Sequence, residues 1–235
     1  MKTVTLFLLG LICITTTTAQ KVIEKNFQYK NQYINLDVKF ANHIEVKTWD
    51  KNTVYFKANL NSNGNKYLNL YKLDIIEKTN AITITSQAKA VFKAFHNEWR
   101  NNNTGKRKYY VNGDEYEFNY ILYVPRNAKF KISSINGDLK AEVIEGNFTA
   151  DLINGNIDIK KYSGDLDLTT VNGEIDLTVE NVNLVAKTVN GDIYASEKLD
   201  LVSEDRHVGS KVWSESSNAK NRLKLNTVNG NMYLR

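Results

Sequence analysis

The feature that most constrains this 235-residue chain is an Asn-Gly pair that returns at regular intervals between Ala128 and the C-terminus. The five pairs are Asn136-Gly137, Asn154-Gly155, Asn172-Gly173, Asn190-Gly191 and Asn229-Gly230. When unit starts are set nine residues apart from Ala128, every unit has the same order of apolar and polar residues. The chain therefore carries a structural repeat, and the five pairs mark its corners.

Each unit has apolar residues two and four positions after its start, with a polar residue between them, which predicts a short strand with one buried face. The first column is Phe130, Leu139, Phe148, Ile157, Leu166, Ile175, Leu184, Ile193 and Val202. The second is Ile132, Ala141, Ala150, Ile159, Leu168, Leu177, Ala186 and Ala195. A third apolar column is predicted just before the corners, at Ile135, Ile144, Ile153, Tyr162, Val171 and Val189. The Gly209 unit is too long, and the register resumes at Asn221.

An Asn-Gly pair between alternating strands also predicts a β-hairpin, because both residues adopt positive φ, so an antiparallel meander is the alternative. The Asn-Gly pair marks the corner only in alternate units, and Glu145, Ser163 and Asn181, the last followed by Val182, stand there in the others. The period is thus mostly eighteen residues, or two strands a turn. This favours an all-β fold, a right-handed two-sheet β-solenoid whose six turns would span ~30 Å.

The chain is expected to form one continuous domain, because no linker separates its halves. Residues 128–235 form the regular solenoid, and residues 20–127 form a less regular β region in which Pro125 ends the last strand. Residues 88–112 interrupt the strands with apolar residues at helical spacing, which predicts a short helix before a hairpin at Asn112-Gly113. Such a helix is expected to cover an end or flank of the core.

The alternative to this structural role is a binding surface, and two breaks in the repeat could provide it. The insertion 88–112 offers His96, Trp99, Arg100 and Tyr109, and the long unit 209–220 offers Trp213. These five residues are the candidate interaction surface.

Residues 1–19 are predicted to be a secretory signal peptide, with Lys2, an apolar run and a small-residue end at Ala19. The single cysteine, Cys13, lies inside it, so a mature chain would have neither disulfide nor thiol chemistry. No second long apolar run is present, so no transmembrane segment is expected in the mature chain. The predicted location is the periplasm, the outer-membrane surface or the medium.

The net charge of +5 conceals an asymmetry. Residues 20–130 hold 18 Lys and Arg against 10 Asp and Glu, whereas residues 131–235 hold 12 against 16. The basic residues are scattered among strand positions and are not gathered on one face, so no nucleic-acid partner is expected.

No catalytic, cofactor-binding or metal-binding residues are predicted, and the chain is expected not to be an enzyme. The three histidines, His43, His96 and His207, lack metal-ligand spacing. Stacking at eighteen residues would align Asp138, Asn156, Glu174 and Asp192, a column that could hold calcium, although a solvated polar ladder is favoured. A second acidic column, Asp158 and Asp176, is interpreted as an exposed strand face. The short corners leave little room for a concave site, so a carbohydrate-active enzyme is the lesser alternative.

The segments Ile135 to Leu139, Val171 to Ile175 and Val189 to Ile193 share an Asn-Gly corner followed by an acidic and an apolar residue. Together with Tyr123-Val124-Pro125 they make the chain, from about Ile34 to Arg235, similar to the bacterial "putative adhesin" family. That resemblance implies an exported, non-catalytic β-solenoid of the cell envelope, and it assigns no functional residues.

The leading hypothesis is a binding module for a protein or glycan at the cell surface, monomeric or weakly self-associating. The alternative is a structural rod that assembles through its terminal strands, since the chain ends at Arg235 in the middle of a repeat.

Overall fold

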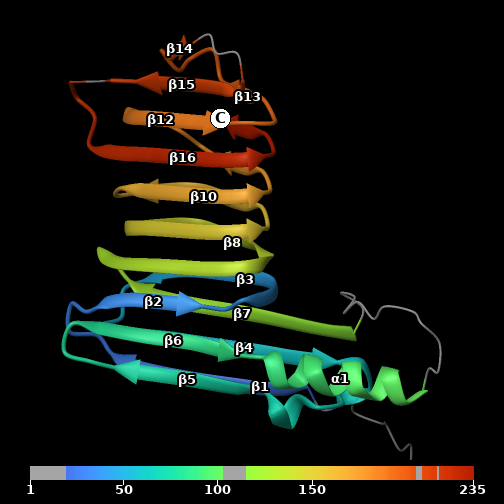
Figure 1. Ribbon diagram of the computed structural model, residues 1–235. Helices are drawn as coiled ribbons and strands as arrows, with labels where there is room; N and C mark the ends of the chain where they lie inside the picture. Colours follow the sequence, from blue (N-terminus) through green and yellow to red (C-terminus); the bar gives the residue numbers. More distant parts are fainter. Residues whose placement is uncertain (1–19, 103–114, 205–207, 216) are drawn as a thin grey trace, which may run out of the picture.

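A computed structural model describes residues 20–102, 115–204, 208–215 and 217–235 (Figure 1). The all-β prediction is confirmed: within these residues seventeen strands hydrogen-bond into one continuous system, accompanied by one α-helix and two short 3₁₀ helices. The predicted signal peptide 1–19, the hairpin at Asn112-Gly113, Tyr109 and His207 lie outside the described residues.

The elements of the first half are β1 (Lys21–Gln28), β2 (Tyr33–Asp37), β3 (Phe40–Trp49), β4 (Thr53–Ser62), η1 (Asn63–Asn65), η2 (Leu68–Leu70), β5 (Lys72–Glu77), β6 (Ala81–Gln87), α1 (Lys89–Asn102) and β7 (Tyr116–Pro125). Those of the second half are β8 (Ala128–Asn154), β9 (Ile157–Ser163), β10 (Leu166–Asn172), β11 (Ile175–Leu177), β12 (Val182–Thr188), β13 (Ile193–Ala195), β14 (Val202–Glu204), β15 (Ser210–Ser214), β16 (Asn221–Asn229) and β17 (Met232–Leu234).

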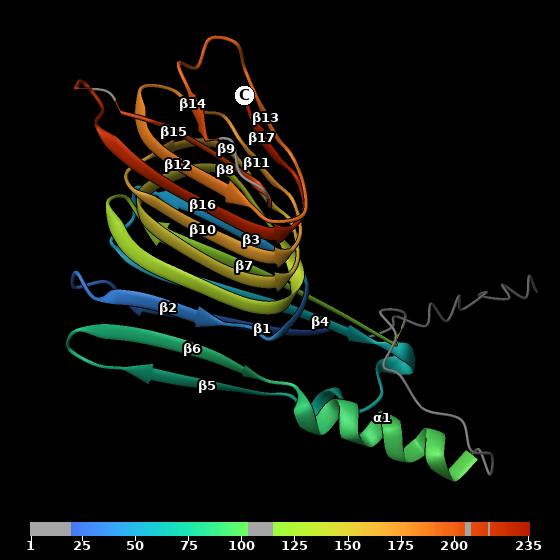
Figure 2. The ribbon, with the colours of Figure 1, turned by 45° about the horizontal axis from the view of Figure 1, so that its top comes forward.

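The strands form two layers that face each other across the core (Figure 2). The front layer runs in the order β5, β6, β2, β8, β10, β16, β12, β15, β14. The back layer runs in the order β1, β4, β7, β3, β8, β9, β11, β17, β13. β8 belongs to both layers because it turns two corners, at Gly137 and Gly146, where φ is +118° and +138°.

Pairing between units eighteen residues apart is parallel, which excludes the meander for the regular repeats. Leu166 of β10 lies opposite Phe148 of β8, and Ile175 of β11 lies opposite Ile157 of β9. Corner amides eighteen residues apart hydrogen-bond to each other, as in Asn154 and Asn136. We define a rung as one front strand together with the back strand that follows it. The rungs stack in register.

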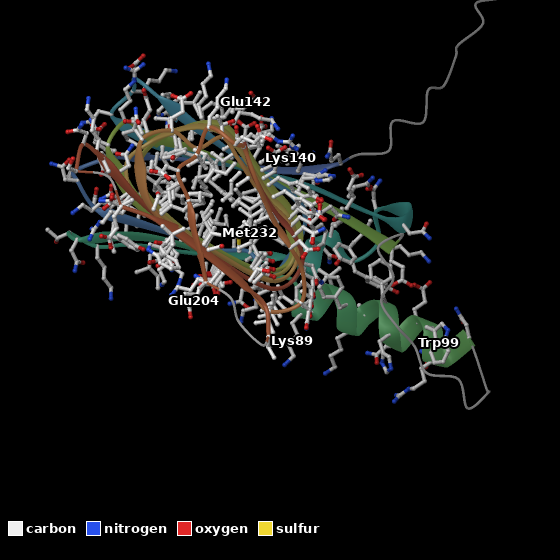
Figure 3. All side chains as sticks on the ribbon, turned by 90° about the horizontal axis from the view of Figure 1, so that it is seen from above. Lys89, Trp99, Lys140, Glu142, Glu204 and Met232 are labelled. Atoms are coloured by element: carbon white, nitrogen blue, oxygen red, sulfur yellow. The ribbon has the colours of Figure 1, made fainter. Side chains whose placement is uncertain are left out.

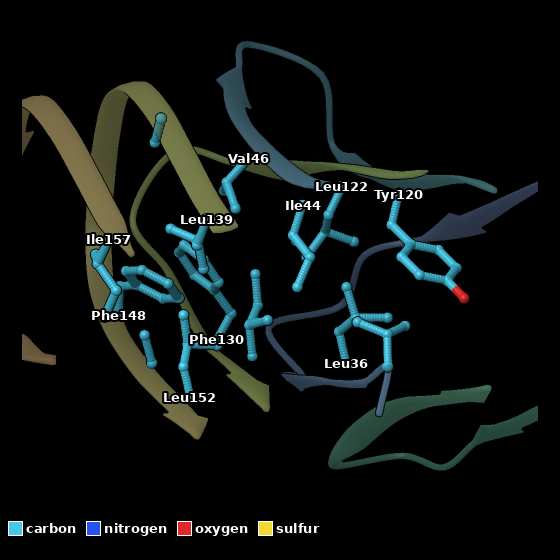
Figure 4. Packing of buried hydrophobic residues seen from close by; sticks show 14 of the residues in the cluster. Leu36, Ile44, Val46, Tyr120, Leu122, Phe130, Leu139, Phe148, Leu152 and Ile157 are labelled. Carbon is cyan, nitrogen blue, oxygen red and sulfur yellow. The ribbon is translucent and has the colours of Figure 1, made fainter. Parts of the chain in front are cut away.

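The core lies between the layers and consists of the two predicted apolar columns. Phe130 and Phe148 stack with ring centroids 4.5 Å apart, and Leu139 and Ile157 face them from the back layer (Figure 4). Each of these side chains is at most 1% exposed. A fully buried aliphatic or aromatic side chain contributes about 1.5 to 3 kcal/mol. The columns therefore hold the layers together without a metal ion or a disulfide.

The predicted third apolar column is wrong for most of its members. Ile153 and Val189 are 44% and 45% exposed, and Ile144 is the member that is fully buried. The reason is the strand alternation, which continues inward from Leu168 to Thr170 and turns Val171 outward. The buried hydroxyl of Thr170 donates to the carbonyl oxygen of Gly155 at 2.9 Å, which removes the cost of its burial.

At the Gly155 corner, glycine is needed for close stacking and not for positive φ. A Cβ on Gly155 would lie 2.1 Å from the carbonyl oxygen of Gly137, and Gly155 itself does not adopt positive φ. None of the five corner asparagines adopts the positive φ that the hairpins of the alternative meander would require. Glycine lets one rung rest directly on the backbone of the rung below.

The last repeat does not end the stack. β16 lies between β10 and β12, and β17 lies between β11 and β13 (Figure 1). Leu223 therefore faces both Leu166 and Leu184. The premise that Arg235 leaves an open terminal rung is wrong, because the long segment 196–220 gives the chain enough length to turn back and insert. In the front layer, β15 and β14 follow β12 with antiparallel pairing.

α1 is the predicted helix within residues 88–112, and it packs beside β7. Val91 and Phe95 are buried, and the ring of Phe92 lies 4.6 Å from that of Phe40 and 4.9 Å from that of Tyr116. The helix lies at the end of the stack formed by β5 and β6, as Figure 2 shows. The helix therefore covers one flank of the core with its apolar side.

Candidate binding groove

A hollow of about 1030 Å³ lies on the outer surface of the front layer. We call it the groove. It crosses β2, β8, β10, β16, β12 and β15, so six neighbouring strands build it. Neighbouring strands are ~4.8 Å apart, which gives the groove a length of roughly 24 Å.

The groove is lined by the side chains that point outward on either side of the first apolar column. One row comprises Tyr33, Lys129, Asn147, Asp165, Arg222, Asn183 and Glu215. The next row comprises Thr149, Asp167, Lys224, Val185 and Trp213. Both rows follow from the alternation of a strand, since Leu166 points inward and its neighbours Asp165 and Asp167 point outward. Stacking in register then places one such residue per strand along each row.

Two ion pairs cross between β10 and β16 in the middle of the groove. Arg222 Nη2 lies 3.0 Å from Asp165 Oδ2, and Lys224 Nζ lies 3.0 Å from Asp167 Oδ2. The backbone N–H of Arg222 also donates to Asp165 Oδ1 at 2.9 Å. This N–H, followed by the guanidinium, lowers the pKa of the Asp165 carboxyl. The centre of the groove thus presents charged groups that already neutralise each other.

Aromatic residues lie toward the two ends of the groove. Tyr33 on β2 is 41% exposed. Trp213 on β15 lies beside Val185 of β12, and Lys211 Nζ stands 4.9 Å from the centre of the indole ring. Lys211 also forms an ion pair with Glu204 of β14. This cation–π contact and ion pair hold the indole against the end of the front layer.

The groove has almost balanced charge. Lys129, Lys187, Arg222 and Lys224 line it together with Asp165, Asp167 and Glu215. The remaining polar lining includes the amides of Asn147, Asn183 and Asn226. The lining is therefore nearly neutral, and it offers several uncharged amides for hydrogen bonding.

The described members of the predicted interaction surface are not all brought together. Trp213 lines the groove, whereas His96, Trp99 and Arg100 lie on α1, and Figure 3 places Trp99 well away from the two layers. Trp99 borders a shallow hollow of about 200 Å³ together with Phe95 and Glu98. Tyr109 lies outside the described residues. The two breaks in the repeat thus contribute to separate surfaces.

The corner asparagines form a continuous amide ladder. Asn154 donates to Asn136, Asn172 to Asn154, Asn229 to Asn172, and Asn190 to Asn229, with distances between 2.7 and 3.0 Å. The spatial order of the ladder differs from the sequence order at Asn229. The ladder therefore serves the stacking of the rungs, and its amides are engaged with each other.

The column considered for calcium is engaged with the backbone. Asp138 Oδ1 accepts the N–H of Asn156 at 2.9 Å, and Asn156 Oδ1 accepts the N–H of Glu174 at 2.8 Å. Asn231 separates Glu174 from Asp192, because β17 is inserted there. Among the described residues, no group of three His, Cys, Asp or Glu side chains is placed to hold a metal ion.

Sequence reasoning missed most of the groove. It interpreted the outward polar residues only as a solvated strand face, and it expected no concave site because the corners are short. The corners are indeed short, but the hollow lies on the sheet surface, where Glu215 and Ser217 after β15 form part of its wall. Aligning the outward residues at eighteen-residue spacing would have identified the rows from Lys129 to Asp165.

Comparison with one solved structure supports the fold. A "putative cell adhesion protein" from Clostridium sporogenes ATCC 15579 superposes with a TM-score of 0.58 at 11% identity, over 92% of this chain and 99% of that one. A "putative adhesin" from Bacteroides fragilis NCTC 9343 gives a TM-score of 0.35 at 8% identity, over 93% and 99%. One from Parabacteroides distasonis ATCC 8503 gives 0.32 at 12% identity, over 74% and 73%. A search of the curated proteins finds no match.

In the described part of the chain, no helix has both the length and the apolar character needed to cross a membrane. Residues 126–235, the part that carries all five Asn-Gly corners, match the family described as Toastrack DUF4097. With this match over the repeat region, and with the fold shared with the Clostridium protein, the predicted resemblance to the "putative adhesin" family, whose function is unknown, is confirmed.

Proposed function

We propose that this chain is an exported, non-catalytic surface-binding protein that holds an extended, uncharged glycan in the groove. The fold it shares with the Clostridium protein, described as a cell adhesion protein, supports a role in binding. In this proposal the rod is a right-handed solenoid with eighteen-residue turns. Residues 1–19 are its signal peptide, and residues 20–235 form one continuous domain.

The observation that carries the proposal is the composition of the groove. It combines the exposed ring of Tyr33, the indole of Trp213 and planar amides such as that of Asn183. A sugar ring offers an apolar C–H face to an aromatic side chain and hydroxyls to amides and carboxylates. Because the groove extends over six strands, it favours a chain of sugars over a compact small molecule.

The charge balance favours an uncharged polymer over a nucleic acid or another polyanion. A polyanion is held by a surplus of Lys and Arg that releases counterions. In the groove, Asp165 and Asp167 neutralise Arg222 and Lys224. The surplus is too small to hold a polyanion.

The Asp165 carboxyl argues against the carbohydrate-active enzyme. Glycoside hydrolysis requires one carboxyl whose pKa is raised so that it can donate a proton to the leaving group. The pKa of Asp165 is instead lowered by the backbone N–H and guanidinium of Arg222. We therefore expect binding without turnover.

The test is binding of the labelled protein to an array of bacterial and host glycans. Trp213→Ala should abolish binding to the glycans that the wild-type protein selects. Trp99→Ala, which changes the same residue type on α1, should leave binding unchanged. If Trp99→Ala abolished binding while Trp213→Ala did not, the site would lie on the insertion. If the wild-type protein bound no glycan on the array, or cleaved those it bound, the proposal would be overturned.

A further inference from the structure

The C-terminal rung, which comprises residues 221–235, occupies a slot inside the stack. Leu223 and Leu225 of β16 and Met232 and Leu234 of β17 are buried. β16 pairs in parallel with β10 on one side and with β12 on the other. β17 likewise pairs with β11 and with β13. The rung is thus held on both sides by strands that precede it in the sequence.

The two sides of the slot also match each other. Leu166 and Leu184 both lie opposite Leu223, and Leu184 follows Leu166 by eighteen residues, the offset that separates Leu166 from Phe148 in the rungs below. β12 therefore carries the register needed to stack directly on β10. Direct stacking of β12 on β10 would therefore leave every side chain in its own column.

The contacts of the C-terminal rung join it to segments far away in the sequence. Asn229 bonds to Asn172, fifty-seven residues earlier, and to Asn190, thirty-nine residues earlier. Thr227 donates to the carbonyl oxygen of Gly173, and Arg222 pairs with Asp165. Residues 196–220 connect the rung to β13. The same contacts would form if the rung came from a second copy of the chain, because each of them depends only on the slot.

We infer that the C-terminal rung is an exchangeable element, and that two copies of this chain form a dimer in which each inserts residues 221–235 into the slot of the other. Exchange of an identical element is a low-cost route to a dimer, because the contacts are preserved. In this dimer Arg222 and Lys224 complete the groove of the partner copy. Self-association then supplies two grooves, which strengthens binding to a repeating surface. The dimer does not depend on the glycan proposal.

The test uses two single-cysteine variants of the full chain in a Cys13→Ser background. Chains with Asn172→Cys are mixed with chains with Asn229→Cys, unfolded, refolded together at high concentration and oxidised. Neighbouring strands are ~4.8 Å apart, within the Cα separation that a disulfide spans. Exchange predicts a disulfide-linked dimer that contains one chain of each kind as the main cross-linked product.

The matched control mixes Asn136→Cys with Asn154→Cys, which form the same kind of amide contact between consecutive rungs. This pair should give little mixed dimer. A chain that carries both Asn172→Cys and Asn229→Cys should form the disulfide internally when diluted, which verifies that the substitutions preserve the slot. Equal yields of mixed dimer from the two mixtures, or no internal disulfide in the double variant, would overturn the inference.

Discussion

The side-chain amide of Asn229 donates a hydrogen bond of 2.7 Å to Oδ1 of Asn172, although eighteen-residue spacing would place Asn190 there. Asn190 instead donates to Asn229. The last repeat has thus inserted between two repeats that are neighbours in the sequence. The slot must remain open, or reopen, until residues 221–235 are available, so the stack cannot be completed in simple sequence order.

The first prediction concerns close stacking at a corner. Gly155→Ala should destabilise the protein by about 3 kcal/mol or more, because its Cβ would press against the backbone of Gly137. Asn154→Ala, at the same corner, should cost about 1 kcal/mol through the loss of ladder hydrogen bonds. Urea unfolding measures both. If the two variants had equal stability, close stacking would not explain the glycine.

The second prediction concerns α1. Phe95→Ala should destabilise the protein by about 3 kcal/mol, because the ring is 7% exposed and packs edge-on against Tyr67 at 5.1 Å. Lys93→Ala, on an exposed position of the same helix, should lie within about 0.5 kcal/mol of wild type. Thermal unfolding distinguishes them. A neutral Phe95→Ala would show that α1 does not cover the core.

The third prediction concerns acid. The pKa of Asp165 is lowered in the folded protein, so its contribution to stability is present above the unfolded pKa of about 4 and is lost as pH falls through the folded value. Asp165→Asn should therefore be less stable than wild type at neutral pH and equal to it in strong acid. Asp50→Asn removes a more exposed pair with Arg126 and should differ little at either pH. Urea unfolding across this pH range tests both variants, and a constant gap for Asp165→Asn would contradict the prediction.

The fourth prediction concerns alkali. Burial raises the pKa of Tyr71 to about 12, and its hydroxyl lies 3.1 Å from that of Tyr120. The associated stability is complete below about pH 10 and is lost as pH rises toward 12. Tyr71→Phe should start about 1 kcal/mol less stable at pH 8 and lose less between pH 10 and 12. Tyr194→Phe, on an exposed tyrosine, should keep the wild-type slope. Identical slopes for all three proteins would refute this assignment.

The sequence predicted the stacking but not the order of the rungs. Phe148, Leu166 and Ile175 alternate with polar residues, and that pattern is sufficient to predict parallel units with two apolar columns. Leu223 and Leu184 carry the same columns, so no local pattern distinguishes insertion from sequential stacking. The choice depends on contacts between distant segments, which a repeat pattern does not encode.

The sequence did not predict the groove, for a related reason. Asp165 and Arg222 each look like an ordinary solvated residue of an exposed strand face. They meet because β16 inserts beside β10. The burial of Thr170 was not predicted, because a polar residue is usually placed on the exposed face. Its hydrogen bond to the carbonyl oxygen of Gly155 accounts for that burial. The apolar core was thus predictable from the sequence, whereas polar contacts between rungs required the structure.

The most direct test of the account is a disulfide map of the amide ladder within single chains that carry Cys13→Ser. Asn172→Cys/Asn229→Cys should form an internal disulfide, because the two positions lie on adjacent strands. Asn172→Cys/Asn190→Cys should not, because two strand spacings, ~9.6 Å, exceed the ~7 Å limit for a disulfide. If the second variant formed the disulfide and the first did not, the rungs would stack in sequence order, and the inserted C-terminal rung would be contradicted.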